Sequence, residues 1–313
     1  MRKYLVLLLI LSLILAATIT TAAATQLTFA TGGTSGTYYP LGEAMAQVWS
    51  KHIPGINVTV QATGASAENI RLINDKKVDL AFVQNDVNHY AYKGIEIFKN
   101  ERRADFKVIA ALYPETVQIV VRAESNIKTV VDLKGKRVSV GAVGSGVEAN
   151  ARQILGNVKL SYRDLTAVFL SFAESADALK NGNIDAFFIV AGHPTTAIMD
   201  IATQHKIRIL DFSDKEISNL RSDYEFYTKV FIPADTYSGL VPPATTVAVK
   251  AALVCNSDLD EALVYNLTKT LFEHLRELNH AKAKEFSLLH AKIGISTPFH
   301  TGALRFFAER NIK

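Results

Sequence analysis

The sequence predicts an α/β fold with two similar lobes, and three observations support this prediction. Short apolar strands alternate with amphipathic helices along most of the chain, which is typical of parallel sheets covered by helices. Each half contains one glycine-rich loop, at 32–37 and at 141–146. The two halves also share one predicted order of strands and helices. The spacing between the glycine-rich loop and a later aspartate is similar in both, 47 residues from Gly32 to Asp79 and 44 from Gly141 to Asp185.

The first half is predicted from apolar runs and the residues that flank them. A helix at 40–50 is expected to begin with Pro40 in its first turn, and Ser66 is expected to cap a helix that runs to Ile73. Tyr113-Pro114 is expected to break the chain between two strands. The expected strands are 26–30, 58–62, 80–83, 108–112 and 117–122.

The stretch from Arg137 to Leu155 is the most informative part of the second half. A short strand at 138–140 leads into Gly141, Gly144 and Gly146, and a helix is expected to follow. The first N–H groups of a helix have no internal partners, and the helix dipole favours negative charge there. A strand, a glycine-rich loop and a helix N-terminus therefore form an anion-binding arrangement. We predict that this loop holds the carboxylate of a small molecule.

The rest of the chain continues the same alternation. Ser171 and Glu174 form a capping-box pattern for a helix that runs to Lys180, and the residues from Asp258 to Glu261 form another for a long helix. Ligands of open α/β sheets bind beyond the carboxyl ends of the strands, so both glycine-rich loops are expected to line one cleft. Further expected elements are strands at 168–170, 186–190 and 246–254 and a helix at 281–291.

The chain is predicted to have a leader and two discontinuous lobes. Arg2 and Lys3 precede an apolar run, and small residues follow, so 1–24 is predicted to be a cleaved signal peptide and the protein periplasmic or extracytoplasmic. An N-terminal membrane anchor is the alternative. With crossover strands near 117–122 and 246–254, lobe I is predicted to comprise 25–118 plus 249–313, and lobe II 119–248.

Composition excludes several classes of protein. Loss of Arg2 and Lys3 lowers the formal charge from +4 to +2, which is too small to indicate a nucleic-acid partner. Cys255 is the single cysteine, so no intramolecular disulfide can form, and its apolar neighbours predict a buried thiol. The eight histidines show no HExxH or HxxxH spacing, and no zinc site or other metal site is expected.

The sequence motifs give little support for a catalytic function. Gly144, Gly146 and Ala149 match a dinucleotide fingerprint, but Asp164 does not clearly end a second strand, and no cofactor is expected. Ser145 lacks the GxSxG context of a hydrolase nucleophile. Asp79 and Asp185 precede matched strands, which favours structural caps over a hydrolytic pair. No catalytic residue is predicted, and the chain is not expected to be an enzyme.

Several polar side chains are candidates for contact with a ligand. Gln84 and Asn85 follow a buried strand, where their amide N–H groups are expected to reach the cleft. Tyr38 suits an amphipathic pocket wall. His193 is expected at the rim of the cleft. Glu148, in the first turn of the helix after the second glycine-rich loop, is expected either to stabilise the helix dipole or to meet a ligand ammonium group.

The chain resembles the TAXI family of TRAP-transporter solute receptors over nearly the whole mature sequence. The resemblance rests on several long motifs in one order: ATGGTSGTYYPLGEAMA, QATGASAENIRLIN, VDLAFVQNDV, ALYPETVQIVVRAES, LKGKRVSVGAVGSGVEANARQIL, LSFAESADALKNGNIDAFF and TTVAVKAALVCNSDLDEALVYNLTK. It implies a two-lobed type II periplasmic-binding-protein fold with a ligand cleft between the lobes. It also implies capture of a small anionic solute, an amino acid or dicarboxylate such as glutamate or 2-oxoglutarate, by a monomer that closes its lobes and delivers the solute to a TRAP membrane subunit.

The resemblance also implies a set of ligand-binding residues and shows some departures. Hydroxyl-bearing residues would be expected where Val147, Asn85 and Val190 stand, so a relative's ligand does not transfer directly. Two other functions stay open: a receptor that signals to a membrane sensor, and an exported hydrolase. The implied ligand contacts are Gly36, Thr37, Tyr38, Gln84, Asn85, Gly144, Ser145, Gly146, Val147, Ala191 and Gly192.

Overall fold

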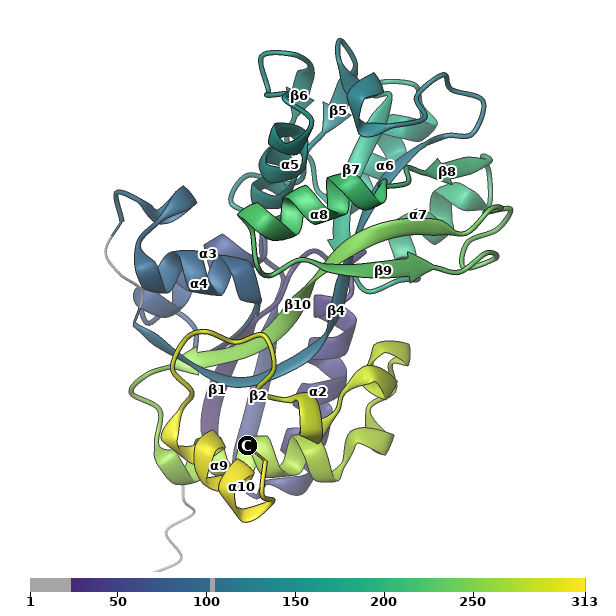
Figure 1. Ribbon diagram of the computed structural model, residues 1–313. Helices are drawn as coiled ribbons and strands as arrows, with labels where there is room; N and C mark the ends of the chain where they lie inside the picture. The colour runs from purple at the N-terminus through teal and green to yellow at the C-terminus, as the bar shows by residue number, and fades with distance from the viewer. Residues whose placement is uncertain (1–23, 102–104, 313) are drawn as a thin grey trace, which may run out of the picture.

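The computed structural model describes residues 24–101 and 105–312, which form two lobes joined by two long strands (Figure 1). The predicted signal peptide lies almost wholly outside the described residues. Lobe I, the lower lobe in Figure 1, contains the N-terminal elements and the C-terminal helices. Its elements are β1 (Thr25–Ala30), α2 (Tyr38–His52), β2 (Ile56–Gln61), α3 (Ser66–Asn74), β3 (Leu80–Gln84), α4 (Asn85–Lys93), η1 (Glu96–Phe98), α9 (Glu261–Glu273), η3 (Leu275–Glu277), η4 (Ala281–Glu285), η5 (Leu288–His290) and α10 (Thr301–Glu309).

Lobe II, the upper lobe in Figure 1, repeats the alternation of strands and helices. The long strands β4 (Phe106–Arg122) and β10 (Ala244–Asn256) run through both lobes. The exact lobe boundaries near residues 118 and 248 stay a prediction. The elements of lobe II are η2 (Val130–Leu133), β5 (Arg137–Ser139), α5 (Gly146–Asn157), β6 (Thr166–Val168), α6 (Phe172–Lys180), β7 (Ala186–Ala191), α7 (Thr196–Ala202), β8 (Ile207–Ile209), α8 (Asp214–Asp223) and β9 (Thr228–Ile232).

The strands form one continuous mixed sheet in the described part of the chain. Its order is β2-β1-β3-β10-β4-β7-β5-β6, with β8 paired to β4 and β9 paired to β10. Strands β1, β2 and β3 pair in parallel in lobe I, and β5, β6 and β7 include the parallel pairs of lobe II. The pairs made by β4 and β10 are antiparallel. The α/β, two-lobed prediction is confirmed.

Strand β4 corrects one expectation. The predicted break at Tyr113-Pro114 was wrong, because β4 is a single strand of 17 residues. Pro114 pairs with Lys250 of β10, and the register of that pair of strands shifts between Lys250 and Ala252. An irregularity at this point allows a residue without an N–H group inside a strand. Both strands therefore pass between the lobes without interruption.

Helix starts were predicted partly correctly. Ser171 and Glu174 form the expected capping box. Ser66 does not cap α3, because its Oγ accepts a hydrogen bond from the backbone N–H of Gln84, 3.1 Å away. The cap of α9 is Asp260, which accepts from the N–H of Leu263 at 2.9 Å, and not a capping box from Asp258.

The helix expected at 281–291 is wrong. That stretch forms the two short 3₁₀ helices η4 and η5. Ala283 and Phe286, three residues apart, are both buried in the core of lobe I. Phe286 is the C-cap residue of η4 and has an extended backbone, so the helical turn ends there and no continuous helix forms over this stretch.

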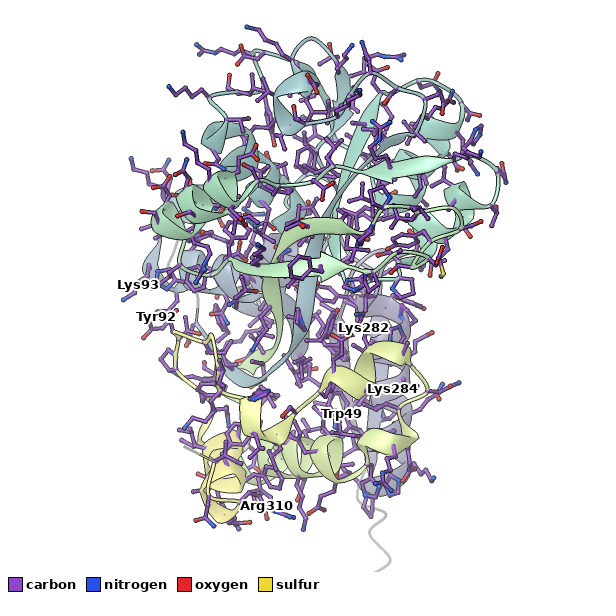
Figure 2. The ribbon with its side chains drawn as sticks, turned by 45° about the vertical axis from the view of Figure 1, so that its right-hand side comes forward. Trp49, Tyr92, Lys93, Lys282, Lys284 and Arg310 are labelled. Carbon is purple, nitrogen blue, oxygen red and sulfur yellow. The ribbon has the colours of Figure 1, made fainter. Side chains whose placement is uncertain are left out.

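Each lobe has its own hydrophobic core, and in each lobe an aspartate at the equivalent position accepts a backbone N–H group of a neighbouring strand. The single tryptophan, Trp49, is fully buried in lobe I, where its Nε1 donates to the carbonyl of Leu267 at 2.9 Å (Figure 2). Asp79 Oδ2 accepts from the N–H of Thr28 at 2.8 Å, and Asp185 Oδ2 accepts from the N–H of Arg137 at 2.8 Å. The prediction that these two aspartates are structural caps is confirmed.

Two further properties complete the fold. Cys255 is fully buried, as predicted, and burial raises the pKa of its thiol. Within the described residues, no helix has the length and apolar character needed to cross a membrane.

Candidate functional site

A pocket lies between the lobes, at the carboxyl ends of β3, β5 and β7. We call it the interlobe pocket. It has a volume of about 120 Å³ and takes its walls from both glycine-rich loops, as expected for a single cleft. Its lining residues are Gly32, Gly33, Gly36, Thr37, Tyr38, Thr63, Gly64, Ala65, Ser66, Gln84, Glu115, Ala142, Ser145, Gly146, Val147, Ser171, Phe172, Val190 and Ala191.

The predicted contact residues divide into two groups. Asn85, Gly144 and Gly192 do not line the interlobe pocket. The other predicted residues do line it: Gly36, Thr37, Tyr38, Gln84, Ser145, Gly146, Val147 and Ala191. Whether these residues bind a ligand stays a prediction, but the structure brings them together around one cavity.

The start of α5 forms one end of the pocket. Ser145 is the N-cap residue, and its Oγ accepts from the N–H of Glu148 at 3.1 Å while donating to the carbonyl of Ala142 at 2.7 Å. Its hydroxyl is therefore already engaged. Gly146 and Val147 follow in the first turn, where backbone N–H groups lack intrahelical acceptors. These N–H groups and the helix dipole make this end of the pocket suitable for an anion.

Glu115 lies at the other side of the pocket, on β4, and sequence reasoning missed it. Its side chain is 2% exposed, and its Oε2 accepts from the Tyr38 hydroxyl at 2.6 Å. Burial raises the pKa of Glu115 to about 8. A carboxylate inside the otherwise apolar run of β4, directly after Pro114, was the signal that could have identified it.

Gln84 makes a hydrogen bond across the cleft. One of its two Nε2–H groups donates to Asn150 Oδ1 at 3.1 Å, and the donation of the other to a ligand stays a prediction. Asn150 in turn donates through Nδ2 to Asp86 Oδ2 at 2.8 Å and to the hydroxyl of Tyr227 at 2.9 Å. This chain of bonds orients the Gln84 amide. Its Oε1 lies buried toward Gly146 and has no hydrogen-bond partner in the described part of the chain.

Asn85 has a structural role in place of the predicted ligand contact. Its Nδ2 donates to the carbonyl of Gly294 at 2.8 Å, and its Oδ1 accepts from the N–H of Lys250 at 2.9 Å. These bonds tie α4 to β10 and to the C-terminal segment. Asn85 therefore contributes to internal bonding and does not line the interlobe pocket.

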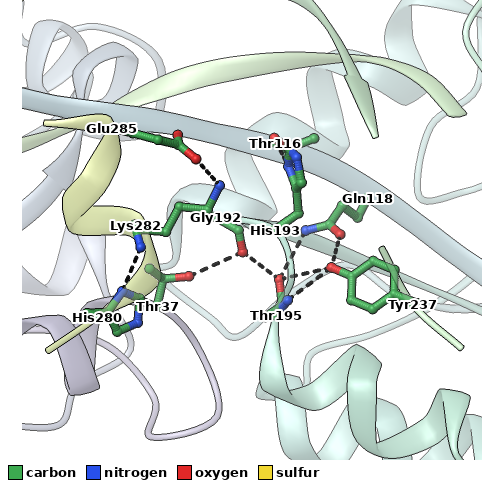
Figure 3. Close-up of polar contacts among 10 residues, drawn as sticks. All are labelled: Thr37, Thr116, Gln118, Gly192, His193, Thr195, Tyr237, His280, Lys282 and Glu285. Carbon is green, nitrogen blue, oxygen red and sulfur yellow. Dashed lines mark hydrogen bonds and ion pairs between the residues drawn. The ribbon is translucent and has the colours of Figure 1, made fainter. Parts of the chain in front are cut away.

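Gly192 and Thr37 contact one another, and Figure 3 shows their surroundings. Thr37 Oγ1 donates to the carbonyl of Gly192 at 3.3 Å, which also accepts from Thr195 Oγ1 at 2.8 Å. A Cβ at Gly192 would lie 2.8 Å from side-chain carbons of Lys282 in lobe I, so a larger residue here would force that buried side chain to move. His193 is partly buried, and its Nδ1 lies 2.9 Å from Thr116 Oγ1.

Several hydrogen bonds connect the two lobes directly. The carbonyl of Gly144 accepts from the N–H groups of Ala67 and Glu68, both at 3.2 Å. On α4, the Tyr90 hydroxyl accepts from Gln153 Nε2 at 3.0 Å. Gly144 thus joins the loop of lobe II to the start of α3 and does not line the pocket. The two lobes are in contact around the pocket, which is a closed arrangement.

Two other groups of charged residues lie away from the pocket. Glu148 forms an ion pair with Arg152 of the same helix at 2.6 Å. This contact supports a helix-stabilising role for Glu148 and not contact with a ligand ammonium group. On the far surface of lobe I, His52, His274 and Glu277 converge, although no zinc spacing was found in the sequence. Lys51 already pairs with Glu277 at 2.7 Å, so these groups form a surface ion-pair network.

The two lobes, the crossing strands and the cleft between them define the architecture of periplasmic solute-binding proteins. The alkanesulfonate-binding protein SsuA from Xanthomonas axonopodis pv. citri, bound to MOPS, superposes with a TM-score of 0.51 and is 17% identical, covering 93% of this chain and 81% of its own. A putative L-cystine ABC transporter protein from Listeria monocytogenes gives a TM-score of 0.52 at 15% identity, covering 81% of this chain and 91% of its own. The chain belongs to the NMT1-like family, whose model matches residues 29–310.

Proposed function

We propose that this protein is an extracytoplasmic receptor that captures a small solute in the interlobe pocket and delivers it to a membrane transporter. The observation that carries the proposal is a pocket whose walls come from both lobes and both glycine-rich loops. A ligand in such a pocket contacts both lobes at once, so it favours the closed arrangement by its differential affinity for that state. Family membership and fold both support a binding function.

The solute we propose is a small carboxylate or amino acid, of which glutamate and 2-oxoglutarate are examples. The N-terminus of α5 supplies backbone N–H groups suited to a carboxylate. No arginine lines the interlobe pocket, whose described lining residues are neutral apart from Glu115. The carboxylate would therefore be held by backbone donors and not by a bidentate ion pair.

The transporter we propose is of the TRAP type, with the TAXI resemblance as its support. One structurally similar protein is a putative L-cystine ABC transporter protein, so an ABC partner is the competing assignment. Reconstitution of the receptor with its genomic partner in vesicles separates the two. Solute uptake that requires an ion gradient supports TRAP, whereas uptake that requires ATP inside the vesicles would contradict it.

Thermal unfolding tests the receptor function directly. Mature protein beginning at Thr25 would be unfolded in the presence of a panel of amino acids and dicarboxylates. A ligand at 100 times its dissociation constant stabilises the folded state by about 2.7 kcal/mol, which raises the Tm of a chain of this size by several degrees. We expect a few related solutes to raise the Tm and to be recovered unchanged. A panel without any shift, on protein shown by mass spectrometry to carry no bound solute, would refute the proposed function.

A further inference from the structure

We propose that a cavity on the other face of the crossing strands is a second binding site, for a monocarboxylate with a compact apolar body, and that its occupancy favours closure of the lobes. We call it the hinge cavity. The residues that define it here are Pro114, Phe226, Lys250, Ile293 and Ile295, which all line it. This inference goes beyond the proposed receptor function, because it concerns a site outside the interlobe pocket with a ligand of its own.

Strand β4 separates the hinge cavity from the interlobe pocket. Successive side chains of a strand point to opposite faces of its sheet. On β4, Glu115 lines the interlobe pocket, whereas the preceding residue, Pro114, lines the hinge cavity. Lys250, which pairs with Pro114 from β10, also lines the hinge cavity. The two cavities share no lining residue and lie on opposite faces of the strands that connect the lobes.

Both lobes contribute to the walls of the hinge cavity. Phe226 and Thr228 come from the start of β9 and the residues before it in lobe II, and Ile293 and Ile295 come from the C-terminal segment of lobe I. The Phe226 ring also packs on α4 of lobe I, with its centroid 5.1 Å from that of His89. The volume and shape of the cavity therefore depend on how the lobes are placed relative to one another.

The size and the walls of the hinge cavity suit a compact apolar group. Its volume is about 290 Å³, against about 120 Å³ for the interlobe pocket. Phe226, Val249 and Ile295 contribute apolar surface, and Ile293 is 55% exposed. Small-molecule sites are mostly concave and apolar, with a few polar groups that orient the ligand. The polar group that matters here is the ammonium of Lys250.

Lys250 has the one cationic side chain among the lining residues, all of which are described. Its Nζ donates to the carbonyl of Ile293 at 3.2 Å, so the ammonium lies at the cavity wall, and it forms no ion pair with the described residues. An ammonium has three N–H donors, which leaves two for a ligand. Burial lowers the pKa of Lys250, and an anion beside it would offset that desolvation.

The distribution of charge favours a single carboxylate on the ligand. Glu225 also lines the cavity, but it is exposed, and an exposed charge is well solvated. A monocarboxylate can pair with Lys250 and place its apolar body against Phe226 and Ile293. A second carboxylate would lie against apolar walls or near Glu225, where it would lack a partner. Dicarboxylates are therefore expected to bind poorly here.

Occupancy of the hinge cavity is expected to favour lobe closure. The lobes are in contact around the interlobe pocket, so the cavity described here is that of the closed arrangement. A ligand complementary to it loses part of its contacts when the lobes move apart, and it therefore binds the closed state more tightly. Coupling between two sites is reciprocal, so each ligand should raise the affinity for the other by the same factor.

Ligand-observed NMR titration of the mature protein tests the site with three probes: phenylacetate, its neutral analogue phenylacetamide, and acetate, which has the charge without the apolar body. We expect phenylacetate to bind at least about tenfold more tightly than either of the others. Lys250→Met keeps an unbranched apolar side chain and should lower the affinity for phenylacetate at least about tenfold. Glu225→Gln removes a like charge and should raise it, whereas Lys284→Met, at an exposed lysine elsewhere on lobe I (Figure 2), should behave like wild type.

Two results would overturn the site. One is phenylacetamide binding as tightly as phenylacetate, and the other is unchanged affinity for phenylacetate in Lys250→Met. If Lys250→Met does not fold, the comparison of the three probes and the gain expected in Glu225→Gln still decide the question.

Calorimetric titration of the solute, with and without saturating phenylacetate, tests the coupling. We expect phenylacetate to raise the affinity for the solute at least about fivefold. Displacement of phenylacetate by the solute would place both in the interlobe pocket and overturn the inference, and independent binding of the two would overturn the coupling. Failure of every solute to bind would count against the receptor function, but the phenylacetate test of the hinge cavity would remain valid.

Discussion

Replacing Gly146 by alanine should prevent full closure of the lobes without harming either lobe. An added Cβ would lie 1.6 Å from Oε1 and 2.4 Å from Cδ of Gln84. Gly146 belongs to α5 of lobe II, whereas Gln84 ends β3 of lobe I. Carbon atoms pack at about 3.5–4.0 Å, so the lobes must separate by more than about 1 Å or Gln84 must move.

The expected loss of affinity follows from these contacts. Moving Gln84 breaks its 3.1 Å bond to Asn150, a loss of about 1 kcal/mol. Inserting a carbon into a packed contact costs about 1–3 kcal/mol. These are alternative ways of relieving one contact, so a cost of about 1–3 kcal/mol falls on the closed state. Since each 1.4 kcal/mol changes affinity tenfold, solute binding should weaken by about 5-fold to 150-fold.

Calorimetric titration with the amino acid that most raises the Tm of wild type would measure this loss. Gly156→Ala is the matched control, because it lies on the same helix and an added Cβ meets nothing within 4 Å. We expect the control to bind like wild type and both variants to have a Tm near the wild-type value without solute. Unchanged affinity of Gly146→Ala would refute the assignment of the lobe contact and of the closed arrangement.

Three further predictions concern stability and can be measured by denaturant unfolding. Asp79→Ala should lower the free energy of unfolding by about 1–3 kcal/mol, because the N–H of Thr28 loses its acceptor; an unchanged midpoint would contradict the cap. Ser171→Ala should lower it by about 1 kcal/mol through loss of the capping box of α6, and an unchanged midpoint would contradict that cap. The raised pKa of Glu115 means that the folded protein keeps a proton that the unfolded chain loses above about pH 4.5. This contribution to stability is full below that pH and is lost as pH rises to about 8, by at most about 4–5 kcal/mol. Glu115→Gln should remove that slope, and an equal slope in both proteins would show that Glu115 does not cause it.

Local patterns predicted the elements whose formation depends on nearby residues. The Gly141–Gly146 loop and the start of α5 were found because a short strand, three glycines and an apolar helix face follow one another in the chain. The capping role of Ser145 was not predicted. Asp79 and Asp185 were identified because each half of the fold repeats their position before a strand. These features need no knowledge of distant segments, so the sequence was sufficient.

Features that depend on distant partners were missed. Pro114 lies inside a strand because Lys250, 136 residues later, lies opposite it with a local shift of register. The hydrogen bond from the Gln84 amide to Asn150 joins residues of different lobes and was not predicted. Glu115 became a candidate only once its burial and its bond to Tyr38 were visible. Each of these depends on which strand or lobe lies opposite, which local periodicity does not encode.

The position of β10 also determines when the fold can be completed. In the sheet, β10 lies between β3 and β4, although β10 comes much later in the chain and is therefore synthesised long after both. Until residue 256 is available, β3 and β4 each lack a neighbour, and a fragment that ends earlier leaves their hydrogen-bonding edges open. Assembly of lobe I must therefore wait for the last quarter of the chain. Such late completion suits the export that we propose, because a chain that crosses a membrane through a narrow pore must not fold beforehand.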